Sequence, residues 1–71
     1  MNAERGMVFC RAMREASRLA REAADELRVC MAVLDADDPV EREVWRRVMD
    51  DVTMLSTIAS GLDDAVRGRD E

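Results

Sequence analysis

Apolar residues in the first half of the chain recur at alternating spacings of four and three residues. This spacing places them on one side of an α-helix and is the a and d pattern of a heptad repeat. It predicts a first helix over residues 3–34. The members of this predicted stripe are Phe9, Met13, Ala16, Ala20, Ala23, Leu27, Cys30 and Leu34.

The second half of the chain repeats the pattern and predicts a second helix over residues 39–67. Gly68 is expected to cap its C-terminal end, because glycine adopts the left-handed conformation that closes many helices. Residues 68–71 would then form a frayed tail. The members of this second stripe are Trp45, Val48, Val52, Leu55, Ala59, Leu62 and Val66.

Residues 35–38 separate the two patterns and carry the signals of a tight turn. Pro39 lacks an amide hydrogen and suits the first position of a helix. Asp38 is expected to act as the N-cap, and Glu41, three residues later, is expected to complete a capping box. A connection this short joins antiparallel neighbours.

We therefore predict an all-α fold, an antiparallel two-helix hairpin similar to a coiled coil, as a single unit over residues 1–71. When the two stripes are laid against each other about the turn, facing residue numbers add to a constant 75. The predicted layers are Cys30 with Trp45, Leu27 with Val48, Ala23 with Val52, Ala20 with Leu55, Ala16 with Ala59, Met13 with Leu62, and Phe9 with Val66.

The apolar stripe is wider than two helices alone can cover, and the excess lies on the same flank of both helices. An exposed apolar patch usually marks an interface. Two hairpins packed by this flank would form a dimeric four-helix bundle, although a different protein could occupy the flank instead. Glu26 and Asp51 interrupt the flank, where they either fix the register of a partner or simply reach solvent. The predicted interface residues are Leu19, Val29, Val33, Val40, Val44, Ile58 and Ala65.

Charged residues make up 38% of the chain, and the net charge is −5. All eleven basic residues are arginine, which indicates a GC-rich genome such as that of an actinobacterium or its phage. Residues 1–34 carry six arginines and five acids, whereas residues 35–71 carry five arginines and eleven acids. The two helices therefore either attract one another or present different faces to partners.

Arginines on the outer face of the first helix lie four residues from acids with which they can pair. The expected pairs are Arg11 with Glu15, Arg18 with Glu22, and Arg21 with Asp25. This row is compatible with a solvated, self-neutralising face and also with a face that binds nucleic-acid phosphates. The candidate nucleic-acid residues are Arg11, Arg14, Arg18, Arg21 and Arg28.

The residue inventory argues against an enzyme. Without histidine, lysine or tyrosine, the serines and threonines have no evident base to activate a nucleophile. No glycine-rich phosphate loop is present, and two cysteines without histidine do not make a structural zinc site. We expect no cofactor and no metal. A carboxylate-metal hydrolase is the third function considered, although the expected positions of the acids, Asp63 among them, point outward or to a flank.

No run of residues approaches the about 18 apolar positions of a transmembrane helix, and no signal peptide is visible. We therefore expect a cytoplasmic protein without a membrane partner, in which the thiols are reduced. Cys10 and Cys30 lie on or beside the predicted stripe. They are either small buried residues, or the site of an intersubunit disulfide or a redox sensor.

The hairpin with the run Leu34-Asp35-Ala36-Asp37 at its turn resembles Rop, a family of small plasmid copy-number proteins. The shared features are heptad layers, an Ala- and Leu-rich stripe that includes cysteine, and an acidic turn. The resemblance implies a homodimer of hairpins that forms an antiparallel four-helix bundle and binds paired RNA loops. It extends to the architecture alone, because the places of the family's RNA-binding residues hold Val8, Glu15, Leu19, Ala23 and Cys30.

Together these features predict a non-catalytic interaction or regulatory protein that binds a protein partner, or itself, through the apolar flank. An adaptor, an inhibitor, an anti-sigma-like regulator and a phage-encoded modulator all belong to this class. The alternative is a Rop-like nucleic-acid-binding regulator that uses the arginine face of the first helix.

Overall fold

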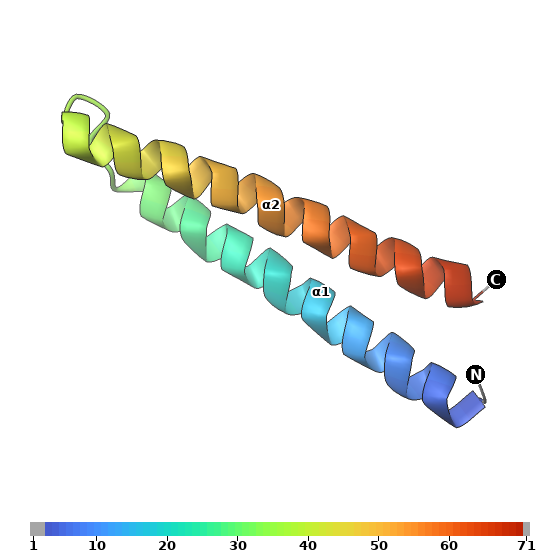
Figure 1. Cartoon of the computed structure of the whole chain (residues 1–71). Coiled ribbons are helices and arrows are strands. Elements are labelled where there is room, and N and C mark those ends of the chain that lie inside the picture. Colours follow the sequence, from blue (N-terminus) through green and yellow to red (C-terminus); the bar gives the residue numbers. More distant parts are fainter. Residues whose placement is uncertain (1–2, 71) are drawn as a thin grey trace.

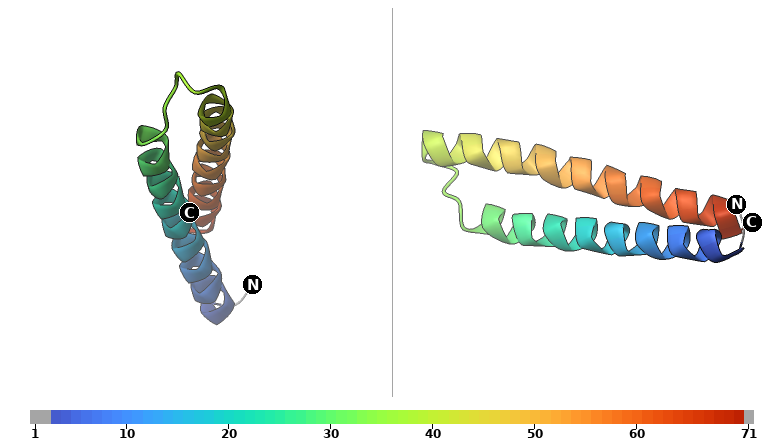
Figure 2. Two further views of the ribbon diagram at one scale, coloured as in Figure 1. Left: turned by 90° about the vertical axis from the view of Figure 1, so that its left-hand side faces the viewer. Right: turned by 60° about the horizontal axis from the view of Figure 1, so that its bottom comes forward.

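The computed structural model describes residues 3–70 and contains two helices, α1 (Ala3–Ala32) and α2 (Pro39–Asp70). The helices run antiparallel and pack against each other, so that both ends of the chain lie at the same end of the molecule (Figure 1, Figure 2). The result is a rod with extents of 55 × 14 × 13 Å. The predicted all-α hairpin is therefore confirmed for the described residues.

The first helix ends at Ala32, two residues before the predicted boundary at Leu34. The amides of Val33 and Leu34 donate to carbonyls three residues earlier, at 3.2 and 3.3 Å. Such bonds tighten the last turn of a helix and satisfy carbonyls that have no partner further along it. The side chain of Asp35 then accepts the amide of Asp37 at 2.9 Å, which begins the turn.

The start of α2 follows the prediction in part. Asp38 is the N-cap, because its Oδ1 atom accepts the amides of Val40 at 2.8 Å and Glu41 at 3.4 Å. The second half of the predicted capping box is wrong. Glu41 accepts the amide of Asp35 at 3.4 Å, while the amide of Asp38 donates to the Asp35 carbonyl at 3.2 Å. The turn itself thus provides the partner that the capping box would have supplied.

The second helix continues past its predicted end. Residues 68–70 are helical, and no glycine in residues 3–70 has a positive φ angle. Gly68 is therefore a helical residue and not a left-handed cap, and the frayed tail predicted to start there is wrong for residues 68–70. Glu71 lies outside the described residues. Near this end the Arg69 guanidinium lies 5.2 Å from the centre of the Phe9 ring, a contact that ties the last turn of α2 to α1.

The core between the helices is a narrow stripe of mostly small side chains. Ala24 and Ala59 are almost fully enclosed, with 2% and 0% of their surface exposed. No large side chain in residues 3–69 is fully buried. The buried residues are Cys10, Ser17, Ala20, Ala24, Val52, Ala59 and Val66.

On α2 the predicted stripe is confirmed from Val48 to Val66, all of whose members are buried or half-buried. Trp45 is the exception, with 39% of its surface exposed. The row from Met13 to Leu34, which follows α1 into the turn, is buried or half-buried as predicted. The second predicted row of α1 is wrong at Ala23 and Cys30, which are exposed. The row one residue further along is buried or half-buried instead: Cys10, Ser17, Ala24 and Met31.

The first helix is therefore rotated about its axis relative to the predicted layers. The layers that paired Ala23 with Val52 and Cys30 with Trp45 do not form. The physical reason lies in the row that replaces them, which has small side chains at residues 10, 17 and 24. Small side chains let the two backbones approach, and the Ser17 hydroxyl finds acceptors on α2.

We predict that Asp38→Ala destabilises the hairpin by about 1 kcal/mol, the usual cost of removing an N-cap acceptor. Two amides at the start of α2 would lose their partner. The measurement is the free energy of unfolding by urea, followed by far-ultraviolet circular dichroism. Asp37→Ala is the matched control, because it removes the same charge from the same turn without touching the cap. Equal losses in the two variants would contradict this role of Asp38.

Candidate interaction surface

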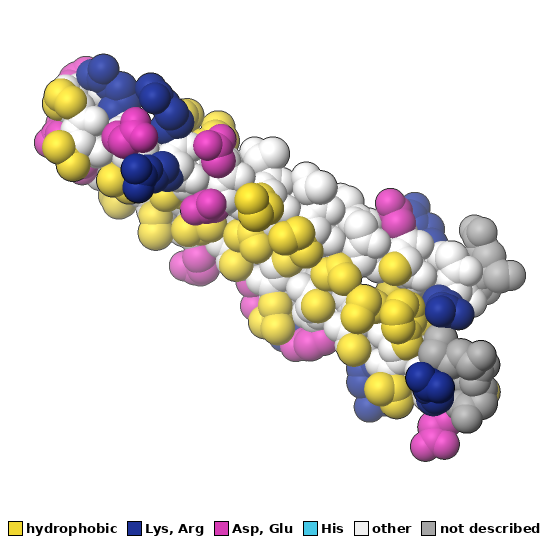
Figure 3. All heavy atoms as spheres, viewed as in Figure 1, with side chains coloured by type: hydrophobic (Ala, Val, Ile, Leu, Met, Phe, Trp, Pro, Cys, Tyr) yellow, Lys and Arg dark blue, Asp and Glu magenta, His cyan; other side chains and the backbone are white. Residues whose placement is uncertain are grey.

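One side of the rod exposes apolar side chains from both helices. We call this surface the apolar face. It is defined by Ala12 and Leu19 of α1, Val33 directly after α1, and Val44, Ile58 and Ala65 of α2, all of which are exposed. The exposed fractions are 51% for Leu19 and 46% for Ile58. Figure 3 shows hydrophobic side chains gathered along both helices, with acidic side chains among them. The rotation of α1 turns its other flank toward α2 and leaves this one uncovered.

The apolar face is built from two rows with a seven-residue repeat. Ser17 Oγ lies 3.5 Å from the Ala59 carbonyl oxygen, and the numbers 17 and 59 add to 76. In an antiparallel pair, residues whose numbers add to about this value lie at the same height along the rod. Leu19 with Ile58, Val33 with Val44, and Ala12 with Ala65 each add to 77. Each of these pairs, which we call rungs, therefore matches residues of similar size and polarity.

Two further predicted interface residues lie near the turn. Val29 and Val40 have 61% and 72% of their surface exposed. Val40 lines a shallow pocket of about 450 Å³ together with Pro39 and Val44, flanked by Glu43 and Arg47. Val29 belongs to neither seven-residue row. The structure thus leaves all seven predicted interface residues exposed and brings the two rows to one side of the rod.

The opposite side of the rod carries a polar cluster that joins the helices. Ser17, with 2% of its surface exposed, donates its hydroxyl hydrogen to Asp63 Oδ1 at 2.7 Å. Arg21 Nη2 donates to Asp63 Oδ2 at 2.6 Å, and Arg21 Nη1 donates to Ser17 Oγ. The three side chains form a closed ring between α1 and α2. The sequence pattern predicts that Asp63 points outward or to a flank, and this prediction does not include its contact with α1.

The ring changes the acid–base behaviour of Asp63. Its pKa is lowered below the ordinary value of 3.8, first by the hydrogen bond from Ser17 and then by that from Arg21. Both bonds favour the charged carboxylate. The folded chain therefore binds a proton at Asp63 less readily than the unfolded chain does. The contribution of the ring to stability is present above the ordinary pKa and is lost as the pH falls through the lowered one.

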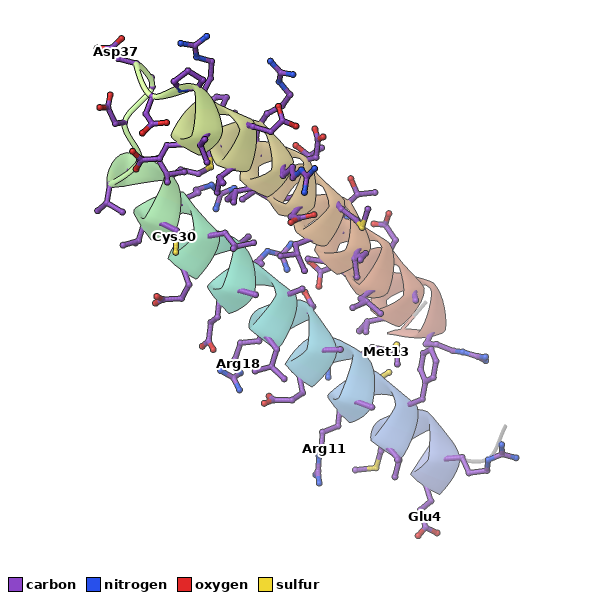
Figure 4. All side chains as sticks on the ribbon, turned by 60° about the vertical axis from the view of Figure 1, so that its left-hand side comes forward. Glu4, Arg11, Met13, Arg18, Cys30 and Asp37 are labelled. Atoms are coloured by element: carbon purple, nitrogen blue, oxygen red, sulfur yellow. The ribbon has the colours of Figure 1, made fainter. Side chains whose placement is uncertain are left out.

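The candidate nucleic-acid arginines on α1 lie among carboxylates. Arg18 pairs with Glu22 at 2.6 Å, as predicted, and also with Glu15. The hydrogen bond from Arg18 lowers the pKa of Glu15, and the hydrogen bond to Glu15 raises the pKa of Arg18. Figure 4 shows Arg11 and Arg18 pointing away from α2, whereas Met13 points toward it.

The other two predicted ion pairs do not form. Asp25 binds Arg28 at 2.8 Å rather than Arg21, and Arg21 crosses to Asp63 at 2.6 Å. Glu15 binds Arg18 and not Arg11. Arg11 and Arg14 are exposed on the same helix. Three of the five candidate arginines, Arg18, Arg21 and Arg28, are thus neutralised by carboxylates on the protein itself.

The cysteines differ in their surroundings. Cys10 is buried between the helices and Cys30 is exposed, and both are free thiols. Within residues 3–69 there is no cluster of three or more His, Cys, Asp or Glu side chains that could hold a metal ion. Over the same residues, neither helix contains an apolar stretch long enough to cross a membrane.

No family model matches the sequence, and neither a curated protein nor a solved structure matches it. The resemblance to Rop therefore rests on the helical hairpin itself.

We predict that Asp63→Asn lowers stability at neutral pH and makes stability less dependent on pH below 3.8, the ordinary carboxyl value. The amide keeps the shape of the carboxylate but loses the charge that Arg21 neutralises. The measurement is the free energy of unfolding across acid and neutral pH. Asp64→Asn is the control, since Asp64 is exposed and pairs only within α2, with Arg67. The same acid dependence in Asp63→Asn and the unaltered protein would contradict the proposed role of the ring.

Proposed function

We propose that this chain is a non-catalytic interaction protein that binds another protein surface through its apolar face. Its first partner is a second copy of itself, with which it forms a dimeric four-helix bundle. The observation that carries the proposal is the set of matched apolar rungs, exposed on a hairpin that fully buries no large side chain in its described residues.

The physical argument begins with the cost of leaving this face in water. Burying a Leu, Ile or Val side chain completely stabilises a protein by about 1.5–3 kcal/mol. Leu19, Val33, Val44 and Ile58 all retain a large part of this potential, because each is more than 40% exposed. Two helices of this size rarely form a stable unit alone. A cover over the apolar face would supply the missing burial.

A second copy of the chain is a partner that is present wherever the chain is made, and it could bury the apolar face. Twofold symmetry places the same patch on both subunits, so a self-complementary surface suffices. The matched rungs have this property, since each level of the face carries side chains of one kind on both helices. A bundle formed in this way has the Rop-like architecture, while its outer surfaces remain available to a different protein. We place the chain among small adaptors, inhibitors and modulators.

Nucleic-acid binding by the α1 arginines is the second candidate and is less well supported. Binding to phosphates requires cationic side chains that can release counterions. Arg18, Arg21 and Arg28 are already paired with carboxylates, which would compete with phosphate. Nothing in the described residues favours this function over protein binding.

We predict that the unaltered protein has the mass of a dimer in solution and that Ile58→Asp makes it a monomer. A carboxylate at Ile58 would be buried without a partner in the proposed interface. The measurement is multi-angle light scattering over a dilution series. Thr57→Asp is the matched control, because this substitution adds the same charge one residue away. Thr57 is exposed, and its hydroxyl donates a hydrogen bond within α2 to the Thr53 carbonyl. A folded monomer of unaltered protein would refute self-association.

We also predict that the protein does not shift RNA hairpins or duplex DNA in a gel at low salt, where phosphate binding is strongest. The α1 carboxylates would repel the phosphates that the arginines attract. A shift that weakens steeply with added salt and is lost in the double variant Arg11→Ala, Arg14→Ala would favour the nucleic-acid function instead.

A further inference from the structure

We propose that Glu26 and Asp51 form an acidic rung within the apolar face and that their charge holds self-association in check. This inference rests on the proposed function, since it concerns the same face and the same partner, a second copy of the chain. It assigns to the two carboxylates the control of how tightly that partner binds.

The position of each acid follows from the seven-residue rows. Glu26 stands between Leu19 and Val33 in the α1 row, and Asp51 stands between Val44 and Ile58 in the α2 row. Their numbers add to 77, as do those of the apolar rungs. The two carboxylates therefore lie at the same height on the same side of the rod. A surface that is otherwise apolar carries two negative charges at one level.

The acids of this rung differ from those on the outer side of α1. Glu15, Glu22 and Asp25 each bind an arginine. Glu26 and Asp51 are exposed and make no ion pair with any residue that the structure describes. The acids on the outer side of α1 are thus neutralised by arginines, whereas the two acids of the apolar face are not.

Unpaired charge has a definite consequence at an interface. Bringing two copies together by this face places four carboxylates of like sign in one interface and removes water from them. Both effects oppose association, because buried charge is costly without a partner and like charges repel across an interface. The apolar rungs favour binding, and the acidic rung limits its strength. Added salt should screen the repulsion and tighten the dimer.

The test is the double variant Glu26→Gln, Asp51→Asn, which removes both charges and keeps the shape of the side chains. Its dissociation constant for self-association, measured by sedimentation equilibrium, should fall by about tenfold or more. Raising the salt concentration should strengthen the unaltered dimer and have little effect on the variant. Circular dichroism checks that the variant remains helical.

The double variant Glu22→Gln, Asp50→Asn is the matched control. It makes the same substitutions within about one helical turn of the acidic rung and changes the net charge equally, but at exposed positions outside the two rows. The control should have the dissociation constant of the unaltered protein. An equal gain in both double variants would overturn the inference in favour of a general effect of net charge.

Two other outcomes overturn the inference. The Glu26→Gln, Asp51→Asn variant could bind with unchanged affinity, or more weakly, in which case the acids are neutral or make an attractive contact. In both cases the proposed function survives, because the copies still associate. If neither the unaltered protein nor the variant associates at any concentration, the proposed function itself fails together with the inference.

Discussion

Two packed helices cannot surround a large side chain, because each helix meets its neighbour along one narrow stripe. The side chains that this hairpin does enclose are small, such as Ala24 and Ala59. Larger residues such as Leu27 and Leu55 are only half-buried. Much of the apolar surface of the chain therefore remains in contact with water. Burying this surface against a further surface would lower the free energy.

The rotation of α1 decides which apolar side chains are left out. Ser17 lies in the contact between the helices, and a buried hydroxyl is costly unless it is hydrogen-bonded. Its bond to Asp63, supported by Arg21, satisfies this requirement on one side of the rod. Among the side chains described, those of residues 3–69, no buried nitrogen or oxygen lacks a partner. Because the polar cluster holds α1 in this orientation, the row that contains Leu19 faces away from α2.

The two sides of the rod thus have different physical characters. On the polar side, Ser17, Arg21 and Asp63 bind one another through hydrogen bonds and an ion pair. The apolar side exposes matched aliphatic side chains to water. It also carries Glu26 and Asp51, which form no ion pair with a described residue. An interaction surface of this kind gains from burial and loses from charge, so its affinity depends on the balance between them.

The sequence by itself determined the two helices, the position of the turn and the exposed apolar rows. These are local properties. Asp38 and Pro39 favour the start of a helix independently of tertiary contacts, and seven-residue spacing places a row on one side of any helix. Only the tertiary structure decided which neighbouring row of α1 faces α2. Residues at 23 and 24 are both alanine, so the pattern alone does not distinguish them.

The ion pairs were also decided by the tertiary structure. An arginine reaches acids three or four residues away in either direction, and a long side chain can reach a facing helix as well. Arg21 therefore had several possible partners, and the choice of Asp63 depended on the Ser17 hydroxyl beside it. Local spacing sets which contacts are possible, but the rotation and closeness of the neighbouring helix select among them.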